Sequence, residues 1–139
     1  MNYKIIGKYI KNLNFNIPNP KVFFLLSKDI KNYKININIE SQQIKQNIIE
    51  VSTTLNLSTS AELQEKINTK IVFASLVELA DNKIEKKEIE KIILINVPSE
   101  IYKELRQIFV GLFEYCGFKD IQISESVDFQ KLYNLKRSQ

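Results

Sequence analysis

The stretch Tyr9–Leu26, YIKNLNFNIPNPKVFFLL, decides the fold, because an alternating strand runs into two prolines that open onto five apolar residues. Ile17 and Asn19 each precede a proline, which favours extended backbone. We therefore expect Val22–Leu26 to lie in a loop rather than in a helix or a strand. Because a protein rarely leaves such a run in water, it should pack on the domain's own core, on another subunit or on an apolar ligand.

Four segments outside and around this stretch alternate with period two, which is typical of half-buried strands. They are Tyr3–Ile17, Tyr33–Glu40, Ile48–Leu57 and Thr69–Leu79. In the first, the odd-numbered residues are expected to share one face. The fourth is apolar at most of its even-numbered positions as well, so both of its faces should be covered.

The connection Ser58–Asn68 fits either a short helix or a hairpin, and we favour the hairpin. After Ala80 the period changes, and a short amphipathic helix is expected to stop near Val97. Pro98 suits the first turn of a second helix that ends at Gly117.

Asp128 could cap a last short helix, followed by a polar, frayed tail at 136–139. Strands first and helices afterwards predict an α+β fold: a four-stranded antiparallel sheet with two to three C-terminal helices packed on one face. Residues 1–139 should form a single domain.

Length and composition are those of an ordinary globular protein, with 139 residues, 44% hydrophobic and 26% charged. No apolar leader or membrane-length segment is visible, and Cys116 is the single cysteine. These features favour a reducing, cytoplasmic location.

The net charge of +4 invites a nucleic-acid or anionic-membrane partner. However, Ile, Asn and Lys together supply 54 of the 139 residues, and Lys outnumbers Arg by 18 to 2. All three residue types have AT-rich codons, and arginine is the best reader of phosphates and bases. Base composition is therefore the favoured source of the charge, and no nucleic-acid partner is expected.

The side chains that carry most enzyme chemistry are missing from the sequence, which has no histidine, one cysteine and three scattered glycines. Cys116 lies on an apolar helical stripe and is expected to be a buried, structural thiol. The carboxylates lie among lysines and are interpreted as a solvated surface. We expect no enzymatic activity, no metal and no cofactor.

The order of these elements resembles SecB, the bacterial export chaperone. The pieces that carry the resemblance are YIKNLNFNIPNP (9–20), YKININIE (33–40), IIEVSTTLNLS (48–58), VPSEIYKELRQIFVGLFEYCGF (97–118) and VDFQKLY (127–133). The resemblance covers nearly the full length of the chain. It implies a homotetramer, a dimer of dimers, which binds unfolded precursor proteins without ATP or a cofactor, keeps them competent for export and delivers them to the SecA motor.

The resemblance also implies that clients bind in apolar grooves near the connection of the first two strands, here Pro18–Asn32. The client-binding candidates are Phe15, Ile17, Val22, Phe23, Phe24, Leu25 and Leu26. Phe109 and Phe113 are expected to belong to the core instead.

The chain departs from the family at the positions that dock SecA. The family's acidic docking residues correspond here to Asn12, Asn16 and Leu76, none of which is charged. Three alternatives follow: a partner surface that changed in parallel, docking through apolar and backbone contacts, or a SecB-like chaperone that serves a toxin–antitoxin system or another dedicated client without SecA. A nucleic-acid binder and a purely structural oligomer are the remaining classes.

Overall fold

The computed structural model describes residues 2–29, 34–58, 68–81, 83–118 and 123–137. The strands are β1 (Tyr3–Asn16), β2 (Lys34–Lys45), β3 (Ile48–Ser58) and β4 (Asn68–Leu79). The helices are α1 (Pro20–Asp29), α3 (Lys86–Lys91), the π-helix η2 (Ile92–Asn96), α4 (Val97–Tyr115) and α5 (Phe129–Arg137).

The four strands form one antiparallel sheet in the order β1-β4-β3-β2, as predicted. β2 continues beyond the predicted end at Glu40 as far as Lys45, because its polar residues keep pairing with β3. The predicted hairpin at 58–68 lies largely outside the described residues. Phe73 and Ala74 face opposite sides of β4 and are both buried, so the centre of this strand is covered on both faces as predicted.

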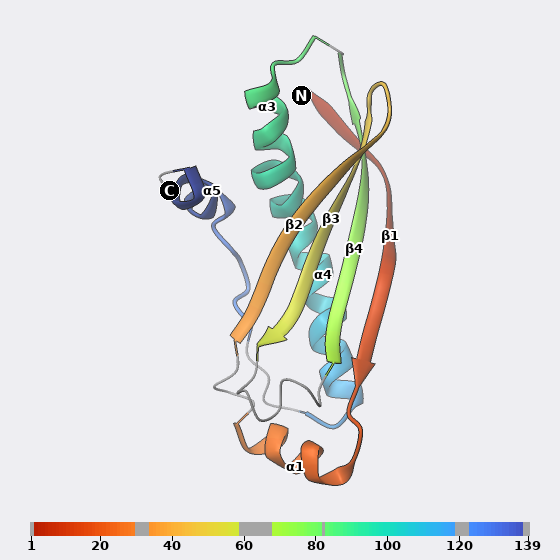
Figure 1. Cartoon of the computed structure of the whole chain (residues 1–139), viewed down its shortest axis with the longest axis vertical. Coiled ribbons are helices and arrows are strands. Elements are labelled where there is room, and N and C mark those ends of the chain that lie inside the picture. Colours follow the sequence, from red (N-terminus) through yellow and green to blue (C-terminus); the bar gives the residue numbers. More distant parts are fainter. Residues whose placement is uncertain (1, 30–33, 59–67, 82, 119–122, 138–139) are drawn as a thin grey trace.

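The column of α3, η2 and α4 covers one face of the sheet, whereas α1 lies beyond the strand ends (Figure 1). Ile101, Leu105, Phe109 and Phe113 of α4 are fully or almost fully buried in one core cluster with Leu55, Ile71 and Phe73. The assignment of Phe109 and Phe113 to the core is therefore confirmed. A second cluster, with Val51, Val77 and Ile92, fills the other half of the same interface.

α4 begins at Val97 with Pro98 in its first turn, as predicted, but nothing separates it from the helix before it, because α3, η2 and α4 form one continuous column along the sheet (Figure 1). Pro98 has no N–H group to donate to the carbonyl of Leu94. The π-turn widens the backbone just before it: the N–H of Val97 donates to the carbonyl of Ile92, and the hydroxyl of Ser99 donates to the carbonyl of Ile95. The proline thus changes the helical pitch without ending the helix.

The predicted loop at Val22–Leu26 is also wrong, because these residues belong to helix α1. Asn19 is its N-cap: its Oδ1 accepts a hydrogen bond from the N–H of Val22 at 2.9 Å, and its carbonyl accepts one from Phe23. Pro20 then occupies the first helical position, where its fixed φ favours the helix. A proline restricts only the residue before it, so Pro20 favours extended backbone at Asn19 but not in the residues that follow.

The prediction that all odd-numbered residues of β1 share one face is wrong. Bulges between Ile5 and Gly7 and between Ile10 and Asn12 each add one residue to β1 relative to β4. Tyr9 pairs with Ala74 and therefore lies on the face opposite α4, whereas Tyr3 and Phe15 lie on the helix side. Two extra residues that alternation alone cannot reveal cause this change of phase.

Two end signals of the helices are confirmed. Gly117 has φ = 95° after α4, and the Oδ1 of Asp128 accepts a hydrogen bond from the N–H of Lys131 at the start of α5. α5 runs to Arg137, so the first two residues of the predicted frayed tail are helical.

Candidate functional site

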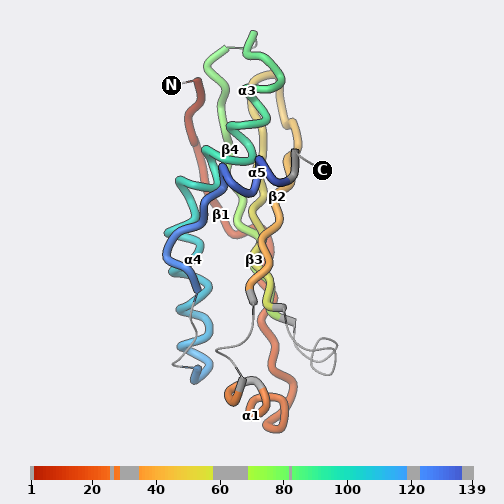
Figure 2. The backbone as a smooth tube through the Cα atoms, turned by 90° about the vertical axis from the view of Figure 1, so that its left-hand side faces the viewer, coloured from red at the N-terminus to blue at the C-terminus, as the bar shows by residue number. Residues whose placement is uncertain are grey.

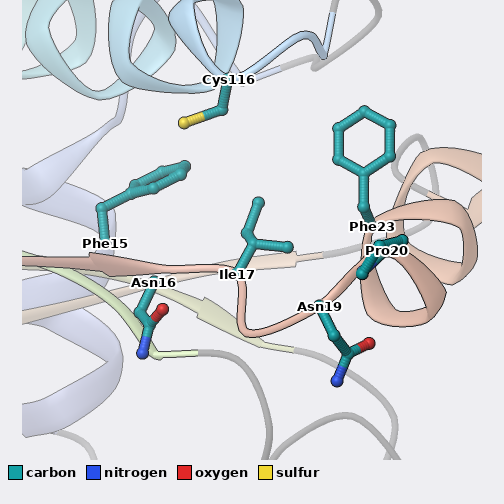
Figure 3. A pocket seen from close by; sticks show the side chains of 7 residues that line it. All are labelled: Phe15, Asn16, Ile17, Asn19, Pro20, Phe23 and Cys116. Carbon is teal, nitrogen blue, oxygen red and sulfur yellow. The ribbon is translucent and has the colours of Figure 1, made fainter.

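An open cavity of about 560 Å³ with a mixed polar and apolar lining lies between the end of β1, the inner side of α1 and the end of α4. It is lined by Phe15, Asn16, Ile17, Asn19, Pro20, Phe23 and Cys116. In Figure 3, Phe15, Ile17 and Phe23 point from β1 and α1 towards α4, and Cys116 reaches towards them from the end of α4. Asn16 and Asn19 point the other way, so the three apolar side chains define the cavity's character.

Aromatic rings build the wall behind this cavity. The ring of Phe15 meets that of Phe113 edge to face at 4.8 Å between centroids, and the ring of Phe23 lies 4.8 Å from that of Phe118. Phe113 and Phe118 are themselves in contact at 5.8 Å. The cavity is therefore continuous with the core, and its geometry depends on where Phe118 is held.

Gly117 holds Phe118 in this position. The N–H of Phe118 donates to the carbonyl of Phe113, and the N–H of Gly117 donates to the carbonyl of Glu114, which together form a Schellman motif. The left-handed φ of Gly117 reverses the direction of the chain after α4, so that Phe118 lies against Phe23. The sequence indicated the helix stop, but not that the residue after the glycine completes the site.

The structure divides the predicted client-binding residues into three groups. Phe15, Ile17 and Phe23 are partly buried and line the cavity. Val22 is buried in the core, whereas Phe24 and Leu25 are exposed and line no part of the cavity. Leu26 belongs to α1, but its side chain lies outside the described part of the chain.

Cys116 is exposed, so the prediction of a buried thiol is wrong. The helical stripe on which it was placed stops packing at Phe113, because Cys116 is already the C-cap with φ = −90°. The thiol lies at the rim of the cavity, where the sequence pattern gave no reason to place it.

A second, smaller apolar cavity of about 180 Å³ separates β2 from α5. It is lined by Ile37, Asn38, Ile39, Leu94, Phe129, Leu132 and Tyr133.

Two hydrogen bonds fix the connector that leads to α5: the hydroxyl of Tyr102 donates to the carbonyl of Ser124 at 2.7 Å, and the Nε of Arg106 donates to the carbonyl of Ile123 at 3.1 Å. This cavity joins segments about 90 residues apart, and sequence reasoning missed it.

The sheet face opposite α4 carries a polar cluster around Glu50, whose carboxylate accepts hydrogen bonds from the hydroxyl of Tyr9 and from Nζ of Lys11, the latter at 2.7 Å. The bonds from Lys11 and Tyr9 hold the pKa of Glu50 below its ordinary value. Glu50 pairs with Leu76 in the register of β3 and β4. The carboxylate of Glu50 thus lies beside Leu76, the position where the family has a docking acid and this sequence has an uncharged residue.

The three positions that correspond to the family's docking acids share this face. Asn12 pairs with Val72 and lines an open polar hollow of about 420 Å³, while Asn16 pairs with Asn68 and Leu76 with Gly7. All three positions oppose or belong to the even-numbered residues of β4, which lie on the face away from α4.

In the described residues, no three His, Cys, Asp or Glu side chains gather where a metal could bind, and no helix is long and apolar enough to cross a membrane. A four-stranded antiparallel sheet covered on one face by a long helix is the α+β fold that the sequence predicted. The chain belongs to the SecB family: the family model described as preprotein translocase subunit SecB matches residues 1–139. It is thus a SecB-family export chaperone, and because such chaperones are not enzymes, the prediction of no enzymatic activity is confirmed.

Related proteins support this assignment along the whole chain. A Pelagibacter ubique protein provisionally assigned as a protein-export protein SecB is 39% identical over 132 residues, covering 95% of this chain and 94% of its own. The protein-export protein SecB of Anaplasma phagocytophilum is 26% identical, covering 94% and 89%. A solved structure of a Mycobacterium tuberculosis SecB-like chaperone in complex with an antitoxin peptide has the same fold, with a TM-score of 0.57 at 10% identity and coverage of 88% and 90%.

Proposed function

We propose that this protein is a cytoplasmic chaperone that binds unfolded precursor proteins through the open cavity between β1, α1 and α4, where the apolar side chains of Phe15, Ile17 and Phe23 make the contacts. The observation that carries the proposal is the convergence of Phe15, Ile17 and Phe23 on one open space of about 560 Å³. A non-native chain exposes apolar side chains, and an aromatic-walled cavity without charged residues in its lining accepts many of them without a fixed geometry.

The proposed client-contact set is narrower than the sequence prediction. Ile17 and Phe23 are its centre, since they are partly buried and point into the cavity (Figure 3). Val22 acts indirectly by anchoring α1 in the core. Phe24 and Leu25 are exposed and line no part of the cavity, and Leu26 remains a proposed member of the set.

Assembly as a homotetramer, a dimer of dimers, is part of the proposal. Its support is the outer edge of the sheet: on β1, the side chains of Ile6, Ile10 and Leu13 are each nearly half exposed. An edge strand with exposed apolar side chains favours pairing with another chain. Multi-angle light scattering should give four times the mass of the chain, and Ile10→Lys with Leu13→Lys should lower it.

Delivery of clients to SecA is the proposed next step, with the sheet face opposite α4 as the docking surface. Asn12, Leu76 and the cluster around Glu50 lie on this face, and they would supply polar and apolar contacts.

The second candidate function is a dedicated chaperone for an antitoxin. It is favoured by the likeness in fold to a SecB-like chaperone whose structure contains an antitoxin peptide.

The proposal is tested by following light scattering while a slow-folding precursor is diluted from denaturant. Wild-type protein should suppress aggregation at equimolar ratio, and Ile17→Ser should suppress it several-fold less. Ile44→Ser is the matched control, because Ile44 is an exposed isoleucine on β2 outside the cavity lining. Equal suppression by both variants would exclude this cavity as the binding site, and no suppression by the wild type would reject the chaperone function.

A further inference from the structure

Helix α1 divides the apolar run of the sequence into two surfaces. Val22 and Phe23 lie on its inner side, where Val22 is 2% exposed and Phe23 rests on Phe118. Residues spaced by three and four positions form its outer side, which we call the tip face: Lys21, Phe24, Leu25 and Lys28. Phe24 is 70% exposed and Leu25 is 40% exposed, so a large apolar area of this helix faces water.

The tip face lies at one end of an elongated molecule. α1 sits beyond the ends of the strands and of α4, at the bottom of both views (Figures 1 and 2). Its inner side packs on the core through Val22 and Phe23, which leaves the outer side facing away from the sheet.

The charge of the tip face complements an anionic surface. Lys21 and Lys28 are exposed and stand one helical turn on either side of Phe24 and Leu25, and the first turn of α1 contains no acidic residue. An aromatic and an aliphatic side chain between lysines is the pattern of a helix that lies in the interface of a membrane, with its apolar residues below the headgroups and its ammonium groups at the phosphates.

We propose that the tip face docks peripherally on an anionic lipid surface, with Phe24 and Leu25 entering the headgroup boundary and Lys21 and Lys28 near the lipid phosphates. A planar bilayer can reach a helix at the end of the molecule and can accept its exposed apolar side chains between the lysines. The inference does not depend on the proposed client binding, since neither Phe24 nor Leu25 lines that cavity.

Flotation of the full chain with vesicles tests the proposal. Protein should float with phosphatidylcholine vesicles that contain phosphatidylglycerol and remain unbound with phosphatidylcholine alone. Phe24→Ser should abolish most of the flotation. Lys21→Gln and Lys28→Gln should each lower the partition coefficient by roughly fivefold, the effect of one lysine near an anionic surface, and added salt should do the same.

Matched controls are Leu132→Ser, an exposed leucine on α5, and Lys70→Gln, an exposed lysine on β4. Both should float like the wild type. Absence of wild-type flotation, or equal flotation of Phe24→Ser and Leu132→Ser, would overturn the proposal. If Phe24→Ser instead loses suppression of precursor aggregation, the tip face is a polypeptide site and the lipid assignment falls. If the vesicle test alone fails, the client-binding proposal still stands, because Ile17→Ser tests it separately.

Discussion

A Cβ atom added to Gly117 would lie 3.4 Å from the Cζ atom of Phe23, although the two residues are 94 positions apart. This close approach joins the end of α4 to α1 and closes one side of the cavity. It also couples a backbone requirement, the left-handed φ at Gly117, to the position of a ring in the proposed client site.

Gly117→Ala should therefore be destabilising. The left-handed backbone opposes any side chain at this position, and the ring of Phe23 leaves the new methyl group no room to move away, so we expect a loss of about 1–3 kcal/mol in the free energy of unfolding. Urea denaturation measures it. Gly111→Ala is the matched control: it lies within α4 with no atom within 4 Å of the added Cβ, and it should gain about 0.5–1 kcal/mol. Equal effects of the two substitutions would contradict the assigned geometry.

Phe23 and Phe24 are neighbours in sequence but should differ in their effect on stability. Phe23→Ser removes a half-buried ring from Phe118, and we expect a loss of about 2 kcal/mol, roughly half that of a fully buried phenylalanine. Phe24→Ser should change the free energy of unfolding by less than about 0.5 kcal/mol, as exposed positions do. Thermal unfolding of the two single variants checks this, and a larger loss for Phe24→Ser would show that the helix is turned the other way.

The pH dependence of stability should contain a contribution from Glu50. Its pKa in the folded protein is lowered by the hydrogen bonds from Lys11 and Tyr9, so the ionised form is stabilised by folding. This contribution is fully present above the ordinary value of 4.5 and is lost as the pH falls below it through the lowered pKa. Urea midpoints measured through this range should fall less steeply for Glu50→Gln than for the wild type.

Glu78→Gln provides the comparison for Glu50, because Glu78 is an exposed glutamate on β4 of the same sheet. Its pH profile should follow that of the wild type. A Glu50→Gln profile that also followed the wild type would mean that the cluster with Tyr9 and Lys11 does not persist in solution.

The hydroxyl of Tyr102 should hold the connector to α5. Tyr102→Phe keeps the buried ring but removes the donor to the carbonyl of Ser124, so we expect a loss of about 0.5–1.5 kcal/mol and faster amide exchange in α5. Tyr115→Phe, at an almost fully exposed position, should change neither quantity. Hydrogen exchange measured by mass spectrometry distinguishes the two, and unchanged exchange in α5 would refute the role of Tyr102.

The strands were predictable because alternation follows directly from the two-residue period of a half-buried strand, and Ile35, Ile37 and Ile39 show it without interruption. The apolar stripe of α4 was predictable for the same kind of reason. What failed were the features that depend on one backbone event: the bulges of β1, the cap at Asn19 and the π-turn before Pro98. Each changes the phase or the continuity of a strand or helix but produces no recognisable period in the spacing of the apolar residues.

The candidate site was predictable in part. Phe15, Ile17 and Phe23 were named from the sequence, but their separation from Phe24 and Leu25 required the rotation of α1 to be known. The exposure of Cys116 and the cavity between β2 and α5 depend on contacts between distant segments, which no local pattern contains.

The two bulges of β1 have a consequence for how this strand tolerates change. Because each adds one residue, the second restores the phase that the first interrupts, and the middle of β1 is inverted while both ends keep their orientation. The extra residue of each bulge has no partner in β4, so its loss would join the flanking pairs in regular order and leave the other side chains of β1 on their present faces. Loss of a paired residue elsewhere in β1 would instead turn its neighbours to the other face of the sheet. Length changes of one residue are therefore compatible with this fold at the bulges but not within the paired stretches.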